Sequence, residues 1–245
     1  MKIVTGGDSF TGHCVEPNIA WPHHIKNHEV IFGAEMASGN QLIARNVVHK
    51  IITNKDVDCV IIGWSDPNRF ELFFNDEESP YLEIKEHFKN KSGLTNQIVT
   101  GEWHPGAKSS WLKSGGGYGP SWKFENKYLD DKMSVYMKEF HNQEYQYIQT
   151  IESILRVQWL CESRNIRLLN FKAWHHNLFK HSYENVRELQ KNIDTKTWWF
   201  YNKQGLKEWC EDRGFTDFPG GHPTTSAQEK FTKEVIQPWL GEDIV

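Results

Sequence analysis

The chain has 245 residues, a formal net charge of −4 and 13% aromatic residues, among them 11 tryptophans. A chain of this length can bury a hydrophobic core without disulfides or metals, and we expect a single domain over residues 1–245. The slightly acidic balance lacks the electrostatic footprint typical of partners of nucleic acids or anionic membranes, so we expect neither as a partner. The sequence gives no indication of the oligomeric state.

Apolar segments and a helical pattern alternate in the first quarter of the chain. Residues 2–5 are predicted to form a strand that stops at a glycine-rich turn, and residues 29–32 a shorter one. Residues 59–63 form a continuous apolar run closed by a glycine, which is typical of a central parallel strand. A helix is predicted over residues 40–53, because its apolar positions share one face: Leu42 or Ile43, Val47, Ile51 and Ile52.

The remainder of the chain begins with a stretch that has no periodicity, residues 90–131, which is rich in Gly, Ser and Trp. We expect an irregular loop laid over the sheet edge, as in lids and binding loops. A helix over about 133–163 and a strand over 166–171 follow, and the last helix begins with a capping-box sequence near Thr225. The alternation of strands and helices predicts an α/β fold, a three-layer sandwich with a central parallel sheet.

Cysteine and histidine patterns give no support for a metal site or a disulfide framework. The four cysteines are widely scattered without a C-x-x-C spacing, and we expect reduced, mostly buried thiols: Cys14, Cys59, Cys161 and Cys210. Adjacent histidines point to different faces of an element, so we expect no metal and no cofactor at the histidine-rich segments: His23, His24 and His28, and His175, His176 and His181. No apolar run is long enough for a signal peptide or a membrane span, so we expect synthesis in the cytosol.

Polar residues follow three of the predicted strands. Ser9 follows the first strand, Gly39-Asn40 opens the helix after the second, and Trp64-Ser65-Asp66 follows the third. Ligands of open parallel sheets bind outside the carboxyl ends of the strands, so we expect these residues to converge there. The glycine-rich turn would expose the Ser9 hydroxyl, as a nucleophile requires, and His222, just before the last helix, would be the base.

These segments resemble the sequence blocks of the SGNH, or GDSL-type, hydrolases. Gly7-Asp8-Ser9-Phe10 resembles the nucleophile block, residues 37–45 the second block, residues 62–66 the third and His222-Pro223 the last. The resemblance spans the chain and is closer to the variant found in phage and other viral genomes, which has an arginine after a Gly-Trp-Ser strand end, here Arg69. It implies the flavodoxin-like SGNH hydrolase fold and, for a viral chain, a location in the host cytoplasm or the virion.

The resemblance also implies a Ser-His-Asp mechanism on an ester. Ser9 would attack the ester carbonyl, His222 would take its proton, and Asp217 would hold the imidazole in the correct tautomer. The family's Asp stands three residues before the His, where this chain has Pro219, and Asp217 lies five residues before. Asp217 therefore has a second interpretation as a turn residue.

The implied oxyanion hole would combine backbone and side-chain donors. The backbone N–H groups would be those of Ser9 and of a residue near Gly39, and the side chain would be that of Ser65 or Asn40. Ser65 stands where the family has Asn, and its hydroxyl can donate one hydrogen bond in that role. Asn40 has an equally good interpretation as the N-cap of its helix.

Aromatic residues complete the expected site. Flat exposed rings stack on sugars or acyl groups, although docking of the 90–131 loop onto its own domain is at least as good an explanation. The candidate substrate-binding residues are Trp64, Trp103, Trp111, Tyr118 and Trp122. The expected substrate is an acyl ester, such as an O-acetyl or other short acyl group on a carbohydrate.

Two function classes remain open at this point. The first is the serine esterase, and the alternative is a non-catalytic or weakly active binding or virion module of the same fold, because Ser65 and Asp217 depart from the family pattern. An α/β-hydrolase elbow is disfavoured, since its second glycine would stand where Thr11 does. Asp66 and Arg69 form either a polar network beside the site or a surface pair that caps the next segment, and we favour the second interpretation.

Overall fold

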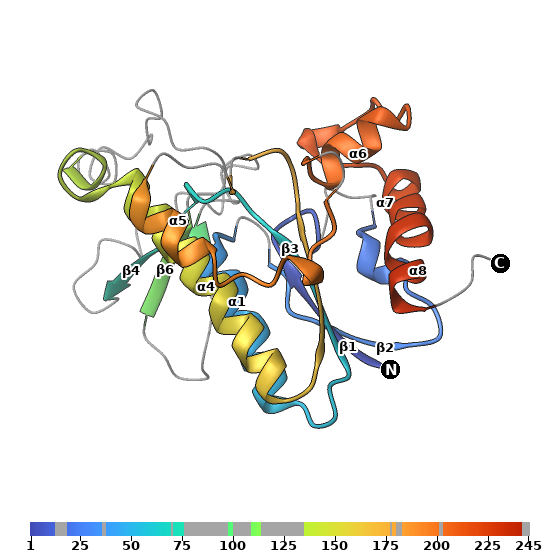
Figure 1. The fold of residues 1–245 in the computed structure, drawn as a ribbon. Coiled ribbons are helices and arrows are strands. Elements are labelled where there is room, and N and C mark those ends of the chain that lie inside the picture. Colours follow the sequence, from blue (N-terminus) through green and yellow to red (C-terminus); the bar gives the residue numbers. More distant parts are fainter. Residues whose placement is uncertain are drawn as a thin grey trace.

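A four-stranded, all-parallel sheet forms the centre of the protein (Figure 1). The computed structural model describes residues 1–12, 19–35, 38–69, 71–75, 98–99, 109–113, 135–176, 178–179, 183–200 and 203–241. The strand order is β2 (Glu29–Phe32), β1 (Lys2–Gly7), β3 (Cys59–Trp64) and β7 (Arg167–Lys172). All four segments predicted as strands are strands, so these predictions are confirmed.

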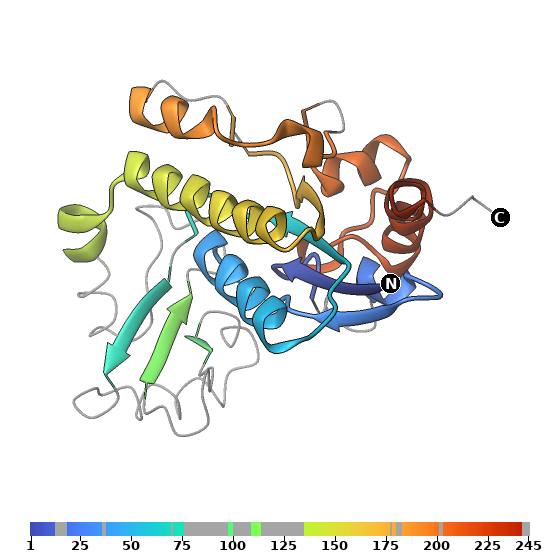
Figure 2. The same ribbon diagram turned by 60° about the horizontal axis from the view of Figure 1, so that its bottom comes forward.

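Helices cover both faces of this sheet. The described part of the chain contains six α-helices: α1 (Asn40–Thr53), α4 (Gln143–Ser163), α5 (Glu184–Gln190), α6 (Leu206–Asp212), α7 (Thr225–Phe231) and α8 (Gln237–Leu240). Helices α1 and α4 lie side by side on one face, while α6, α7 and α8 lie on the other (Figures 1 and 2). The arrangement is a three-layer α/β sandwich, as the alternation of elements predicts.

Short helical turns connect the larger elements. They are η1 (Trp21–His24), η2 (Tyr136–Phe140), η3 (Thr195–Thr197), η4 (Pro219–Gly221) and η5 (Thr232–Ile236). The predicted helix over 133–163 is interrupted after η2, because Asn142 has extended backbone and its side chain accepts a hydrogen bond from the backbone N–H of Tyr145 as the N-cap of α4.

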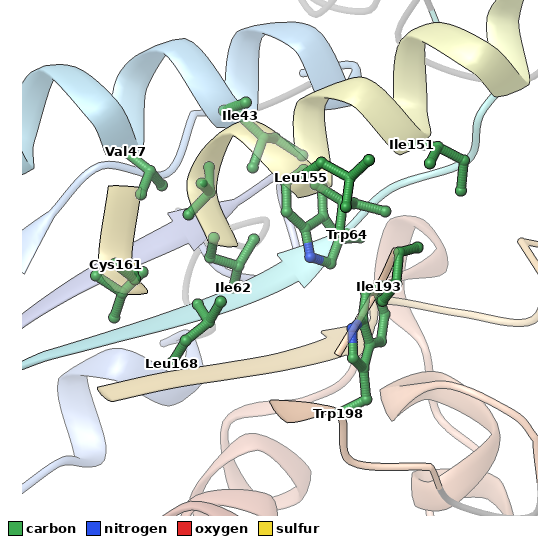
Figure 3. Packing of buried hydrophobic residues seen from close by; sticks show 14 of the residues in the cluster. Ile43, Val47, Ile62, Trp64, Ile151, Leu155, Cys161, Leu168, Ile193 and Trp198 are labelled. Atoms are coloured by element: carbon green, nitrogen blue, oxygen red, sulfur yellow. The ribbon is translucent and has the colours of Figure 1, made fainter. Parts of the chain in front are cut away.

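The two-residue period of the strands divides the core into two clusters. Val60, Ile62 and Trp64 of β3 pack toward α1 and α4, whereas Cys59 and Ile61 pack toward α6 and α7. Figure 3 shows the first cluster, in which side chains of α1 and α4 meet those of β3 and β7. Both faces of the central strand are therefore apolar, which explains why its sequence is a continuous apolar run.

The segment predicted to be an irregular loop contains strands. In a second, antiparallel sheet of order β4-β6-β5, β4 (Glu71–Asn75) and β5 (Ile98–Val99) both pair with β6 (Ser109–Lys113). The expectation of irregular structure throughout 90–131 is thus wrong at β5 and β6, because strand pairing is fixed by a partner distant in sequence. Of the aromatic candidates there, Trp111 is described only as a member of β6, and Trp103, Tyr118 and Trp122 lie outside the described residues.

Three of the four cysteines are buried free thiols, as expected. They are Cys59, Cys161 and Cys210, and burial raises the pKa of each thiol to about 12. Cys14 lies outside the described residues. In the described part of the chain, no helix combines the length and apolar character needed to cross a bilayer.

Candidate active site

A tight turn after β1 presents the Ser9 side chain. The backbone carbonyl of Asp8 accepts hydrogen bonds from the N–H groups of Thr11 (3.0 Å) and Gly12 (2.8 Å). Gly7, at the start of the turn, has a φ of 153°, and a Cβ there would lie 2.1 Å from Thr11 Oγ1. Only glycine fits at this position, which explains the glycine before Asp8-Ser9.

The turn brings Ser9 against His222, whose sequence position is more than 200 residues away. The distance from Ser9 Oγ to His222 Nε2 is 2.6 Å, a hydrogen bond. His222 follows the η4 turn, where Gly220 and Gly221 have φ values of 60° and 83°. The predicted pairing of these two residues at the carboxyl edge of the sheet is therefore present in the structure.

Buried contacts hold the two ends of the chain together at this point. The side chain of Gln228 in α7 is fully buried, accepts a hydrogen bond from Trp21 N (3.2 Å) and donates one to the Phe10 carbonyl (3.3 Å). The Phe10 ring lies 5.2 Å from the His222 ring, centroid to centroid. Gln228 thus fixes α7, and with it the segment that carries His222, to the nucleophile turn.

Asp8 is the centre of a buried polar network beside the Ser9–His222 pair. Its carboxylate is fully buried and accepts hydrogen bonds from Phe10 N (3.0 Å), Ser65 Oγ (2.8 Å) and Arg69 Nη1 (3.0 Å). The bond to Phe10 N closes an Asx turn around Ser9. Because each carboxylate oxygen has a donor, the negative charge is compensated without solvent.

Arg69 belongs to this network rather than to the surface. Its side chain is 9% exposed, forms an ion pair with Asp8, and places its guanidinium 4.4 Å from the centroid of the Trp174 ring. Trp174 in turn contacts Phe10, with ring centroids 5.1 Å apart. The favoured interpretation of Arg69 as a surface residue is wrong, whereas that of Asp66 as a cap is confirmed by its bond from Asn68 N (2.7 Å).

The structure gives Ser65 and Asn40 partners other than an oxyanion. The single hydroxyl hydrogen of Ser65 is donated to Asp8, and the two amide hydrogens of Asn40 are donated to Ser65 O (3.0 Å) and Thr150 Oγ1 (3.2 Å). Asn40 Oδ1 accepts from Ser65 N at 2.8 Å. The predicted side-chain oxyanion donors are thus both occupied, and the N-cap of α1 is Gly39 instead of Asn40.

Trp64 is a core residue, which contradicts its predicted role in substrate binding. Its side chain is fully buried among residues of α1 and α4 (Figure 3). Its indole N–H donates to Asn170 Oδ1 at 2.9 Å. The alternation along β3 turns it toward this layer, and the same rule directs Gly63 to the opposite one. A buried Trp with a satisfied N–H has no surface left for a ligand.

The Asp217 carboxylate makes no described hydrogen bond to His222. The buried Nδ1 atom of His222 makes no well-aligned hydrogen bond among the described residues, and the Gly220 carbonyl acts on it only as a weak acceptor. Burial lowers the pKa of His222 below its ordinary value of 6.5, while the charge of Asp8 and the Gly220 carbonyl raise it and the charge of Arg69 lowers it. The net lowering keeps the imidazole neutral at pH 7, the form that accepts a proton.

Several residues of the site carry no signal in the sequence. Trp174 stands in no recognisable motif, Gln228 is distinguished only as a capping-box candidate with Thr225, and Arg69 only by the resemblance to the viral variant. A glutamine in an amphipathic helix is ordinarily a solvent-facing residue, and only the contact of α7 with the nucleophile turn buries it. Neither the scan against protein-family models nor the search of curated proteins finds a match to this chain.

Proposed function

We propose that this chain is a serine hydrolase of the SGNH type that cleaves an acyl ester through Ser9 and His222. The observation that supports the proposal most strongly is the 2.6 Å hydrogen bond between Ser9 Oγ and His222 Nε2. A nucleophile and a base within hydrogen-bond distance are the minimum that acyl transfer requires. The parallel sheet, the turn after β1 and the resemblance of four sequence blocks support the same assignment.

The protonation state of the site favours this chemistry. A neutral His222 accepts the Ser9 proton as Oγ forms its bond to the acyl carbon, and it returns the proton to the leaving alcohol when the ester C–O bond breaks. Water then attacks the acyl-Ser9 ester with the same base. The negative charge of Asp8 stabilises the imidazolium electrostatically, and Arg69 limits that effect.

The backbone N–H groups of Ser9 and of a residue near Gly39 are proposed as the oxyanion donors. A short acyl ester of a carbohydrate is the proposed substrate. Asp8, Ser65 and Arg69 position the nucleophile turn, which is a role in geometry rather than in contact with the reacting atoms. Asp217 is retained as the candidate partner of Nδ1 in the substrate complex, since catalytic hydrogen bonds often form only there.

A second candidate function rests on the state of His222 Nδ1. No carboxylate of the described residues holds His222 Nδ1, so the ring is less firmly fixed in one tautomer, and loss of a carboxylate partner in a serine protease costs about 10⁴ in kcat. This observation favours a weakly active or non-catalytic binding module of the same fold. The two candidates differ in whether Ser9 is an activated nucleophile.

Labelling with a fluorophosphonate separates the two candidates. We expect the wild type to react, and to release p-nitrophenol from a short-chain p-nitrophenyl ester with a burst. We expect Ser9→Ala to do neither while keeping the wild-type circular dichroism spectrum. Ser163→Ala, which alters an exposed serine at the end of α4, is the matched control and should behave as wild type. An unlabelled wild type would support the binding module, and labelling of Ser9→Ala would exclude Ser9 as the nucleophile.

A further inference from the structure

A second cavity lies at the carboxyl end of β7, apart from Ser9 and His222. Its volume is about 500 Å³, within the range of small-molecule sites, and it is lined by Lys172, His176, Phe179, Gln190, Phe200 and Lys203, among others. Lys172 ends β7, the edge strand, and β3 separates that strand from β1, which leads to Ser9. None of these six residues takes part in the proposed hydrolysis.

The cavity is lined by a buried ammonium that forms no ion pair among the described residues. Lys172 is 4% exposed, and its ammonium donates to the backbone carbonyls of His176 (3.4 Å) and Lys203 (2.5 Å). Both acceptors are neutral, and no carboxylate forms an ion pair with Lys172 among the described residues. Burial lowers the pKa of this ammonium, as expected for a cation taken out of water, and outweighs the effect of the nearest acid.

The carboxylate nearest in effect to Lys172, that of Glu208, is hydrogen-bonded to other groups. The charge of Glu208 raises the pKa of Lys172 against the effect of burial. The Glu208 carboxylate accepts hydrogen bonds from His175 N (2.8 Å) and Gly205 N (2.9 Å), and so caps helix α6. Lys172 donates two of its three ammonium hydrogens to the carbonyls of His176 and Lys203, and Glu208 does not take the third, so one hydrogen remains for another acceptor.

Two of the lining residues are phenylalanines that form an aromatic wall. Phe179 and Phe200 meet edge to face with centroids 5.5 Å apart, and Phe200 also stacks on Trp198 at 5.7 Å. Phe200 is 41% exposed, which leaves apolar surface for a ligand. Burial lowers the pKa of His176 to about 3, so this wall residue is neutral and does not add to the charge.

We propose that this cavity binds a small amphipathic carboxylate, a medium-chain fatty acid or an arylalkanoate. The carboxylate would accept the remaining hydrogen of the Lys172 ammonium, with Lys203 nearby, and the apolar body would lie against Phe179 and Phe200. A charge-assisted hydrogen bond at a buried ammonium is among the stronger polar contacts in proteins. Binding needs no turnover at Ser9 and is independent of the proposed hydrolysis.

Calorimetric titration with octanoate tests the proposal, with octanamide as the uncharged analogue of equal length. We expect octanoate to bind wild type and Ser9→Ala equally, with a Kd below about 1 mM, and octanamide to bind at least about tenfold more weakly. Lys172→Met should weaken octanoate binding at least about tenfold and leave octanamide nearly unaffected. Lys207→Met, which removes a partly exposed lysine of α6 outside the cavity, is the matched control and should bind as wild type.

Lys172→Met leaves two carbonyls without their donor, so two exposed positions provide a second test. Phe200→Ser should weaken both octanoate and octanamide, and Lys203→Gln should weaken octanoate alone. The proposal is overturned if octanoate shows no binding at about 10 mM, if octanamide binds as tightly as octanoate, or if the folded cavity variants all bind octanoate like the wild type.

Discussion

Replacing Arg69 by Met tests the conclusion that the Asp8 network supports the nucleophile turn. The substitution keeps most of the aliphatic volume and removes the guanidinium. Asp8 would keep its bonds from Ser65 and Phe10 N but lose its only described cationic partner. The Asp8 carboxylate is fully buried, so it would be left as an uncompensated charge in the protein interior.

The expected loss of stability follows from that burial. Breaking a buried ion pair by removing one partner costs about 3 to 5 kcal/mol. Loss of the contact between the guanidinium and Trp174 adds about 0.5 to 2 kcal/mol, and the two bonds that Asp8 retains reduce the total. We therefore expect Arg69→Met to lower the free energy of unfolding by about 3 to 5 kcal/mol, and Asp8→Asn in the same chain to recover a large part of it.

Urea unfolding followed by circular dichroism measures the effect, and the chain contains a matched control. Arg213 also bonds a carboxylate, Glu234 Oε2 at 2.8 Å, and also lies over a tryptophan ring, that of Trp209 at 4.1 Å. Its pair is about one third exposed, so Arg213→Met should cost only about 1 kcal/mol. Equal losses for the two variants, or no recovery with Asp8→Asn, would refute the assignment of Asp8 and Arg69 as a buried, coupled pair.

Three further predictions concern catalysis on an activated ester. Ser65→Ala should reduce kcat less than about tenfold, because the Ser65 hydroxyl donates its hydrogen to Asp8; a loss of about 10²- to 10³-fold would instead identify Ser65 as an oxyanion donor. Asp217→Ala should reduce kcat by up to about 10⁴-fold, because this carboxylate is proposed to hold His222 in the substrate complex; a loss of less than about tenfold would show that it does not orient the imidazole. The pKa of free His222 is lowered below 6.5, so kcat/KM should rise with pH through an inflection below 6.5 and then level off; an inflection above 6.5 would contradict the burial of the ring.

Much of the fold is predictable from the sequence because it depends on local periodicity. Strands β1, β2, β3 and β7 and helix α1 are apolar runs or amphipathic patterns bounded by polar residues and glycines, and these patterns specify type and position almost alone. Strands β5 and β6 carry no such pattern. Their conformation depends on pairing in the second sheet, and a partner distant in the chain is not visible in a local window.

The positions of Ser9 and His222 at one edge also follow from the sequence, since the carboxyl ends of parallel strands share an edge. The sequence does not show which neighbouring residues contact Ser9 and His222 or a bound substrate. Ser65, Asn40 and Trp64 are residue types that can bind an oxyanion or a ligand. Each donor has a fixed number of hydrogens, however, and each side chain points to one side of its strand or helix. The tertiary structure directs the first two to Asp8, the Ser65 backbone and Thr150, and turns the indole into the core. The sequence alone determined that the candidate catalytic residues lie at the carboxyl edge of the sheet. Only the packing of distant segments decided which hydrogen-bond donors there are free to contact a substrate.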